Sequence, residues 1–273
     1  PEIASRKHLE AVNWVVEQAL EEAGCTFSRL SAIAATYGPG LVGALLVGVN
    51  TAKTLAYALE KPLVAVNHML SHVAANYLVH DVPFPAVCLV VSGGHTSLLY
   101  VNARDDAELL GATRDDAAGE AFDKIARVLD LGYPGGPAVD QISRRGDAAA
   151  FTFPRAFSGR DDILEFSFSG LKSAVINTLH TIRQRKETVP AADIAASFQA
   201  AVVDILVEKT RLAAKMKQTK AVLLAGGVAA NQMLRTHLQQ GLREDGRQLF
   251  YPPAQLCTDN AAMVAAAGWD RYK

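Results

Sequence analysis

The sequence has few cysteines, little charge and no excess of either sign of charge. Cys25, Cys88 and Cys257 lie far apart and form no CxxC pair, which excludes a disulfide framework or a thiolate zinc site and favours a reducing compartment. Lys+Arg 27 and Asp+Glu 28 give a net charge of -1, so the composition implies no general polyanion-binding surface, and any nucleic-acid contact must be local. Half of the residues are apolar, which excludes a disordered chain.

The sequence also lacks an unbroken apolar helix. Residues 30–52 carry no charge and would be long enough to cross a bilayer as one helix. Gly38-Pro39-Gly40 interrupts this stretch, so we expect a buried strand, a turn and a helix instead. Charges throughout the first thirty residues argue against a signal peptide, and a soluble cytoplasmic protein is expected.

Short apolar runs alternate with longer amphipathic ones, which predicts an α/β fold of sheets covered by helices. Strands are expected at residues 32–36, 63–66, 86–91, 97–102, 222–225 and 248–251. Helices are expected at residues 5–23, 41–59, 68–79, 117–129, 171–186, 191–217, 231–240 and 259–272. Residues 133–169 are rich in Gly, Pro, Phe and Arg and are expected to be irregular or mobile.

Two histidines follow a predicted strand and open a helix. His68 and His72 share one helix face, with Asn67 as the expected N-cap, so both rings could reach one divalent ion. The alternative is that one histidine caps the helix and the other packs in the core. The usual zinc-protease general base is missing, because no Glu follows His68.

Asp259 is the candidate for a third ligand, because it lies where a Pro-Pro loop leads into the last helix. Two histidines and one carboxylate would leave open positions for substrate and suit iron or zinc. Taken alone, an Asp in a first helical turn is ordinarily explained by compensation of the helix dipole.

Three glycine turns follow or precede regular elements: Ser92-Gly93-Gly94, Gly135-Gly136-Pro137 and Gly226-Gly227. The alternative for the first is a plain hairpin, and the alternative for the last is an ordinary strand-to-helix connection. Gly135-Gly136-Pro137 places a proline at a helix start, or is a structural turn. At Gly226-Gly227, free backbone N–H groups could meet a phosphate or a ribose, with Asn231 one turn further on, and two glycine turns at strand ends suggest a nucleotide cleft. None of the turns matches GxxxxGK[ST], which excludes a P-loop.

Charged residues form several other groups. Glu120 and Lys124 are spaced as an i,i+4 pair, and Asp123 could face a ligand hydroxyl or lie on a solvated face. Basic clusters could follow an RNA backbone or simply be exposed helix surface. They are Arg144-Arg145, the run 183–186, and Lys209, Arg211, Lys215, Lys217 and Lys220.

Six motifs in this order resemble the TsaD family, the tRNA N6-adenosine threonylcarbamoyltransferases once called O-sialoglycoprotein endopeptidases, in its bacterial form. The motifs are NHMLSH, VVSGGHTSL, DDAAGEAFDKIARVLDLGYPGGP, FSFSGLKSAV, GGVAAN and CTDNAAM. The resemblance covers essentially the whole chain. It implies the two-lobed fold of actin, sugar kinases and Hsp70, with ribonuclease H-like lobes and nucleotide between them.

The resemblance also implies a division of the chain. Residues 1–66 would form a partial N-terminal lobe completed by the helix at 260–273, and residues 67–259 a C-terminal lobe with the metal and nucleotide sites. His68, His72 and Asp259 match the family's metal ligands, with iron(II) or zinc as the ion, and no further catalytic residue is assigned. The ligand-binding positions matched are Val90, Val91, Ser92, Gly93, Gly94, Asp123, Gly136, Asp140 and Asn231.

The family transfers a threonylcarbamoyl group from threonylcarbamoyl-AMP to N6 of the adenosine 3′ of the anticodon, in tRNAs that read codons beginning with A. The resemblance implies tRNA as substrate, TsaB and TsaE as partners, and a TsaC-type enzyme as the source of the adenylate. Alternatives are a metallopeptidase and a non-catalytic scaffold of the same fold, which would need no metal.

One feature departs from the family pattern. Family members begin with a β-hairpin carrying an acidic loop, and this sequence begins roughly forty residues later. The N-terminal lobe is therefore expected to be truncated, while the ligand-binding motifs are retained and completeness for turnover stays open. A native gene product longer than this chain, measured by mass spectrometry, would show that the sequence is a fragment.

Overall fold

The computed structural model describes residues 2–273, which divide into two compact units. The first unit contains the chain up to Leu78 together with Asn260–Lys273, and the second is Val79–Asp259. No helix in the described part of the chain combines the length and the apolar character needed to span a bilayer. Each unit has its own sheet and its own core.

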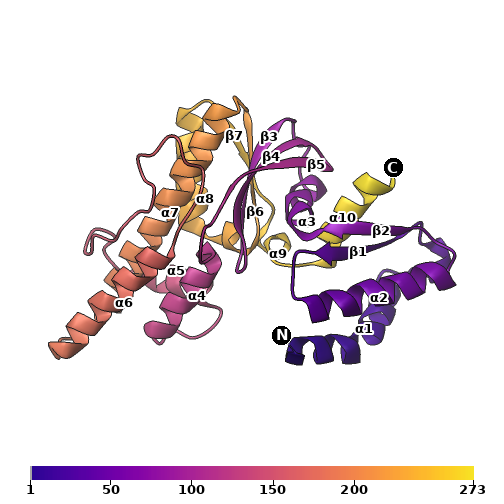
Figure 1. The fold of residues 1–273 in the computed structure, drawn as a ribbon, viewed down its shortest axis with the longest axis horizontal. Helices are drawn as coiled ribbons and strands as arrows, with labels where there is room; N and C mark the ends of the chain where they lie inside the picture. The colour runs from indigo at the N-terminus through magenta and orange to yellow at the C-terminus, as the bar shows by residue number, and fades with distance from the viewer. Residues whose placement is uncertain (1) are drawn as a thin grey trace. The chain divides into compact units, whose positions relative to one another are not determined.

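The first unit is built on two parallel strands, with α10 on one side and α1 and α2 on the other (Figure 1). Gly268 lets α10 lie directly on the strands, because a Cβ at this position would be 2.7 Å from Cβ of Ala34. The elements are α1 (Glu2–Glu22), η1 (Phe27–Arg29), β1 (Ile33–Gly38), α2 (Val42–Ala58), β2 (Leu63–Asn67), α3 (His68–Ala74), η2 (Ala75–Leu78) and α10 (Ala261–Tyr272).

The second unit is built on a five-stranded sheet in the order β5-β4-β3-β6-β7. β3 pairs antiparallel with β4, and β4 with β5, whereas β6 and β7 run parallel to β3. The strands are β3 (Ala86–Val91), β4 (Thr96–Ala103), β5 (Asp106–Ala112), β6 (Ala221–Ala225) and β7 (Gln248–Phe250).

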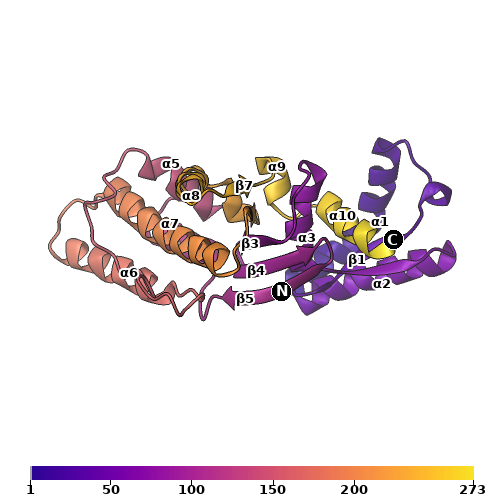
Figure 2. The ribbon, with the colours of Figure 1, turned by 90° about the horizontal axis from the view of Figure 1, so that it is seen from above.

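Helices cover this sheet, with α7 packed against β3 and against α8 (Figures 1 and 2). All six residues of β3 are buried, as expected of a strand covered on both faces. The helices are α4 (Ala118–Val128), α5 (Gly135–Ser143), α6 (Ser169–Gln184), α7 (Ala191–Met216), η3 (Gly227–Ala230), α8 (Gln232–Glu244) and α9 (Ala254–Cys257).

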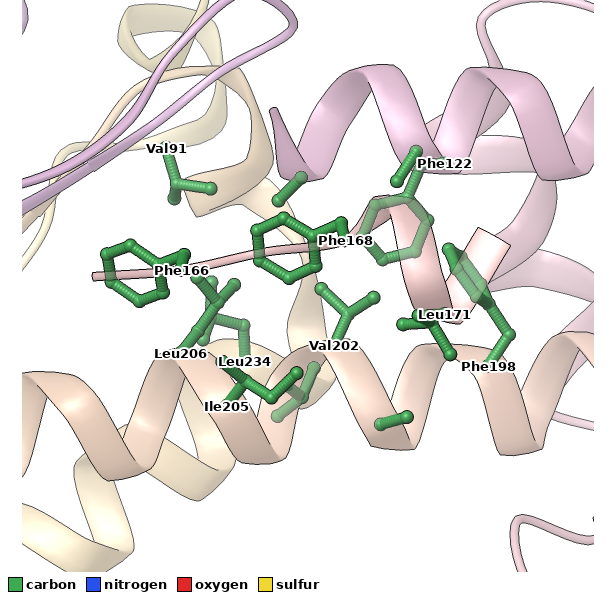
Figure 3. Close-up of a cluster of buried hydrophobic side chains, with 14 of the residues drawn as sticks. Val91, Phe122, Phe166, Phe168, Leu171, Phe198, Val202, Ile205, Leu206 and Leu234 are labelled. Carbon is green, nitrogen blue, oxygen red and sulfur yellow. The ribbon is translucent and has the colours of Figure 1, made fainter. Parts of the chain in front are cut away.

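Phenylalanines from three segments fill the core beside α7 (Figure 3). Phe122 of α4 meets Phe198 of α7 edge to face, with ring centroids 5.3 Å apart. Phe166 and Phe168 come from the extended segment before α6, and both are fully buried. The extended segment therefore belongs to the core of the second unit, and a single bridge between Phe166 and Thr113 joins it to the end of β5.

The predicted α/β class and all six predicted strands are confirmed. The sequence did not predict β5, the short helix α9, or α5 beyond the proline at its start. β5 is largely exposed, so its sequence carries little apolar alternation, and α5 lies inside the stretch 133–169 that was expected to be irregular. α5 forms because Val139 is fully buried against the neighbouring helices, a tertiary contact that the Gly-Gly-Pro start conceals.

The division between the units also differs from the expected one. It falls after Leu78 rather than after residue 66, and α3 therefore belongs to the first unit. The reason is packing: α3 contacts α10 and β2, and Ala74 joins the small core around Val66 and Ala267. The histidine pair is accordingly not part of the second unit, where the nucleotide-side motifs lie.

We expect Phe198→Ala to lower the free energy of unfolding by about 3–5 kcal/mol, because the lost ring leaves a cavity in a fully buried cluster. Urea unfolding followed by circular dichroism measures this. Leu109→Ala, at a side chain that is 61% exposed, is the control and should change stability by about 0.5 kcal/mol or less. Equal losses in both variants would contradict the core described above.

Candidate functional site

The two glycine turns predicted to face a ligand lie at the same edge of the second unit's sheet. β3 and β6 are adjacent and parallel, with Val90 opposite Ala225. Ser92-Gly93-Gly94 follows the carboxyl end of β3, and Gly226-Gly227 follows the carboxyl end of β6. Ligands of open α/β sheets bind outside the carboxyl ends of the strands, so both turns lie where a nucleotide would be expected.

The first turn is held by its own hydrogen bonds and by α4. The Ser92 N–H donates to the His95 carbonyl at 2.8 Å, and the His95 N–H donates to Ser92 Oγ at 3.2 Å. The Gly119 N–H donates to the Ser92 carbonyl at 3.2 Å. A Cβ on Gly119 would lie 2.5 Å from that carbonyl oxygen, so only glycine lets α4 begin this close to the turn.

The second turn depends on Gly226. Its φ is +92°, a backbone conformation that side chains disfavour, and a Cβ there would lie 2.3 Å from the Val91 carbonyl oxygen. Gly226 therefore lets the β6 turn pack directly on the end of β3. Gly227 has room, because the nearest atom to its added Cβ is Thr258 Cγ2 at 3.9 Å.

Asp123 contacts Gly135, the first residue of α5, next to Gly136. Asp123 Oδ1 accepts a hydrogen bond from the Gly135 N–H at 2.8 Å, which fixes the orientation of the carboxylate. A Cβ on Gly135 would be 2.5 Å from Asp123 Cα, whereas Gly136 has open space around it. The structure therefore ties Asp123 to the glycine turn of α5 rather than to the Glu120–Lys124 pair, whose charged atoms are 2.8 Å apart.

Asp140 and Asn231, which are far apart in the sequence, meet across α5 and α8. Asn231 Nδ2 lies 3.4 Å from Asp140 Oδ1 and donates to Gln199 Oε1 at 2.8 Å. Asn231 Oδ1 caps α8 by accepting from the Leu234 N–H. Asp140 Oδ2 pairs with Arg144 at 2.7 Å, so Arg144, grouped above with a basic cluster, is engaged with this site.

Two neighbouring aspartates, Asp115 and Asp116, connect the segment before α4 to the start of α6. Asp115 accepts four hydrogen bonds from the residues that start α6, namely Ser167, Phe168 and Ser169, and Asp116 pairs with Lys124 and Lys172. Partial burial tends to raise the pKa of Asp116, but the two lysines outweigh it and hold that pKa below its usual value of 3.8. Asp116 is 15% exposed and Lys172 22%, so the Asp116–Lys172 pair is partly shielded from solvent.

The histidine pair opens α3 as predicted. Asn67 caps the helix, with its side-chain oxygen accepting from the N–H groups of Met69 and Leu70. The rings of His68 and His72 lie 4.7 Å apart between centroids, and His72 is 1% exposed. The i,i+4 spacing therefore brings both rings to one side of the helix.

Asp259 directly precedes Asn260, which caps α10, and α10 packs against α3 within the first unit. One ligand atom each of His68, His72 and Asp259 lies within 4.8 Å of the others. Ligands about 2.1 Å from a shared ion are roughly 3.4 Å apart in a tetrahedral site, so small side-chain rotations would fit these three to a metal.

The sequence analysis gave no role at these sites to Asp116, Gly119 or Gln199, and it did not predict the contact of Gly226 with Val91. Gln199 is a single amide among the apolar residues of α7, and this is the only feature of the sequence that could have indicated its role. The basic clusters also need correction. Lys209 is fully buried, where its ammonium donates to the carbonyls of Phe157 and Arg160, so it is not part of an exposed basic surface.

The chain matches the family model described as "TsaD: tRNA N6-adenosine threonylcarbamoyltransferase" over residues 1–266. The chain belongs to the TsaD family. A relative from Moorella thermoacetica is 56% identical over 273 residues, which is all of this chain and 80% of that protein. One from Halalkalibacterium halodurans is 54% identical over the same length and 79% of that protein. Both are named tRNA N6-adenosine threonylcarbamoyltransferase.

Solved structures support the fold of this TsaD-family chain. Full-length HypF in a phosphate- and nucleotide-bound form aligns with a TM-score of 0.70 at 14% identity, covering 96% of this chain and 42% of HypF. HypF from T. kodakarensis aligns with a TM-score of 0.64 at 16% identity, over 91% of this chain and 42% of that one. At these identities the likeness concerns the fold alone.

We expect Gly226→Ala to lower the free energy of unfolding by about 2 kcal/mol, because an alanine there is strained at φ +92° and collides with Val91. Gly227→Ala is the matched control, since its Cβ has room, and should change stability by about 0.5 kcal/mol. Thermal and urea unfolding measure both. A control that loses as much stability as Gly226→Ala would contradict this description of the turn.

The lowered pKa of Asp116 predicts a pH-dependent contribution to stability. The contribution is complete above about pH 5 and is lost as the pH falls through 3.8 and below, where the carboxylate is protonated in the folded state too. Asp116→Asn should therefore cost about 1.5 kcal/mol at pH 7 and much less at pH 3. Urea unfolding at both values, with the exposed Asp161→Asn as control, would contradict the assignment if the cost did not depend on pH.

Proposed function

We propose that this chain transfers a threonylcarbamoyl group from threonylcarbamoyl-AMP to N6 of the adenosine 3′ of the anticodon in tRNAs that read codons beginning with A, forming N6-threonylcarbamoyladenosine. Family membership over residues 1–266 is the observation that carries this proposal. The paired glycine turns and the cluster of two histidines and one aspartate add to it, because an acyl transfer from an adenylate needs groups that hold AMP and polarise a carbonyl.

The adenylate is proposed to lie at the carboxyl edge of β3 and β6. Backbone N–H groups of residues 92–94 and 226–227 would bind the phosphate, since such turns favour anions. Asp140 and Asn231 would hold the nucleoside, and Asp123, fixed by the Gly135 N–H, would accept a hydrogen bond from a ligand hydroxyl. The Gly119 N–H of α4 donates to the Ser92 carbonyl, so the backbone N–H groups of the first turn are held in place before the ligand binds.

His68, His72 and Asp259 are proposed to hold one divalent ion, iron(II) or zinc. When bound there, the ion would supply Lewis-acid polarisation of the carbamoyl carbonyl. The N6 amine of adenosine is a weak nucleophile, so the chain's main task is to hold the acceptor and the carbonyl carbon in line. The amine nitrogen forms the new bond, the bond from the carbonyl carbon to the phosphate oxygen breaks, AMP leaves and the amine loses a proton.

The proposed partners are tRNA, TsaB and TsaE, with a TsaC-type enzyme supplying the adenylate. Several large, exposed apolar side chains on α1 and α2 support a protein partner for the first unit, because exposed apolar surface is typical of interaction sites. The most exposed of them are Ile3, Leu9, Trp14, Val42, Leu46 and Tyr57.

The transfer of labelled threonylcarbamoyl to tRNA tests the proposed function directly. We expect this chain, together with TsaB, TsaE and a TsaC-type enzyme, to label tRNA at the adenosine 3′ of the anticodon. Labelling that does not depend on this chain would contradict the proposal.

Metal content and activity are expected to fall together in Asp259→Ala and His72→Ala. Each variant removes one of three ligands, so bound iron or zinc should drop from about one ion per chain to a small fraction, with tRNA labelling reduced at least tenfold. His8→Ala, at an exposed histidine of α1, is the control and should keep both. Full activity of Asp259→Ala would rule out the metal role, and a metal-free wild type would favour a non-catalytic scaffold.

A further inference from the structure

One continuous set of hydrogen bonds joins α5, α7 and α8 through Gln199. The side chain of Gln199 is 3% exposed and lies in the middle of α7, between apolar neighbours. Gln199 Nε2 donates to Ser143 Oγ at 3.0 Å, and Gln199 Oε1 accepts from Asn231 Nδ2 at 2.8 Å. All of these residues belong to the second unit.

The orientation of the Gln199 amide is fixed from the α5 end. The Ser143 hydroxyl donates to the Asp140 backbone carbonyl at 2.9 Å, and a carbonyl can only accept. Ser143 Oγ must therefore accept from Gln199, which has to present its NH₂ group to Ser143 and its oxygen to Asn231.

The α8 end requires the same orientation independently. The Leu234 N–H can only donate, and it donates to Asn231 Oδ1 at 2.9 Å. The NH₂ group of Asn231 must therefore point toward Gln199, and the side-chain oxygen of Gln199 must accept its hydrogen bond. Because both ends specify one arrangement, the network holds the Asn231 amide in a single orientation.

We propose that Gln199 is a positioning residue of the nucleotide site, which sets the Asn231 amide for an adenylate. This inference rests on the proposed function, because Asn231 is one of the residues proposed to hold the nucleoside. Gln199 acts through Asn231, and Ser143 acts by fixing the Gln199 amide. Without it, the Asn231 amide would keep only the Leu234 cap and the longer 3.4 Å approach to Asp140 Oδ1.

Packing alone does not explain an amide at this position. An apolar side chain of similar length would fill the same space without the cost of burying a polar group. An apolar side chain cannot form the hydrogen bonds that orient the side chains of Asn231 and Ser143. A purely structural residue would change stability, whereas a positioning residue changes the affinity for nucleotide.

Isothermal titration with AMP tests the inference. Gln199→Met keeps the side-chain length and removes the hydrogen bonds, and we expect it to weaken AMP binding about five- to tenfold. Asn231→Ala should weaken AMP binding at least as much. The double variant should bind AMP no more weakly than Asn231→Ala, because Gln199 acts through Asn231.

Ser197→Ala is the matched control on the same helix. Ser197 is 1% exposed, and its Oγ accepts from the Phe151 N–H and donates to the Asp147 carbonyl. Its loss should lower the melting temperature and leave the AMP affinity unchanged. Ser143→Ala, a milder change in the network, should weaken AMP binding about twofold in the wild-type background and not at all beside Asn231→Ala.

Three results would overturn the role of Gln199 alone: AMP affinity of Gln199→Met equal to that of the wild type, additive losses in the double variant, or an equal loss in Ser197→Ala. Failure of the wild-type chain to bind AMP would instead overturn the proposed nucleotide site, and the inference with it.

Discussion

The parallel pairing of β3 with β6 is the constraint on which the nucleotide side of this molecule depends. It places Val90 opposite Ala225, so the two strands end together and both glycine turns emerge at one edge of the sheet. Gly226 then packs on Val91, and Gly119 packs on Ser92, each at a distance that excludes a Cβ. The turns are therefore shaped by contacts between backbones, which cannot adjust as side chains do, and their N–H groups are held before any ligand binds.

Charged and polar side chains hold the surrounding helices to this edge. Asp115 caps the start of α6, and Asp116 joins α4 to α6 through two lysines. Gln199 joins α5 to α8 through hydrogen bonds between uncharged groups. Gln199 is buried and Asp116 is partly buried, and each has its partners present, so each costs less than an unpaired group would and favours one arrangement of the site.

Much of the fold was predictable because its signals are local. The apolar runs of β3 and β6, the Asn67 cap and the i,i+4 spacing of His68 and His72 are all readable within a few residues. β5 and α5 were missed for the opposite reason: β5 is exposed, and α5 depends on burying Val139 against helices distant in sequence. Gln199 and the burial of Lys209 were missed because their roles depend on long-range partners. The family resemblance supplied Asp140 and Gly136, which no local pattern singled out as ligand-binding.

Amide hydrogen exchange of this chain with and without AMP tests the central claim most directly, namely that an adenylate binds where β3 and β6 end. The account predicts slower exchange at the amides of residues 92–94 and 226–227 when AMP is present, with both turns protected over the same range of AMP concentration. Exchange at the far end of α6, around His180, should stay unchanged. Protection by AMP elsewhere in the chain, with both turns exchanging as in the free protein, would contradict it.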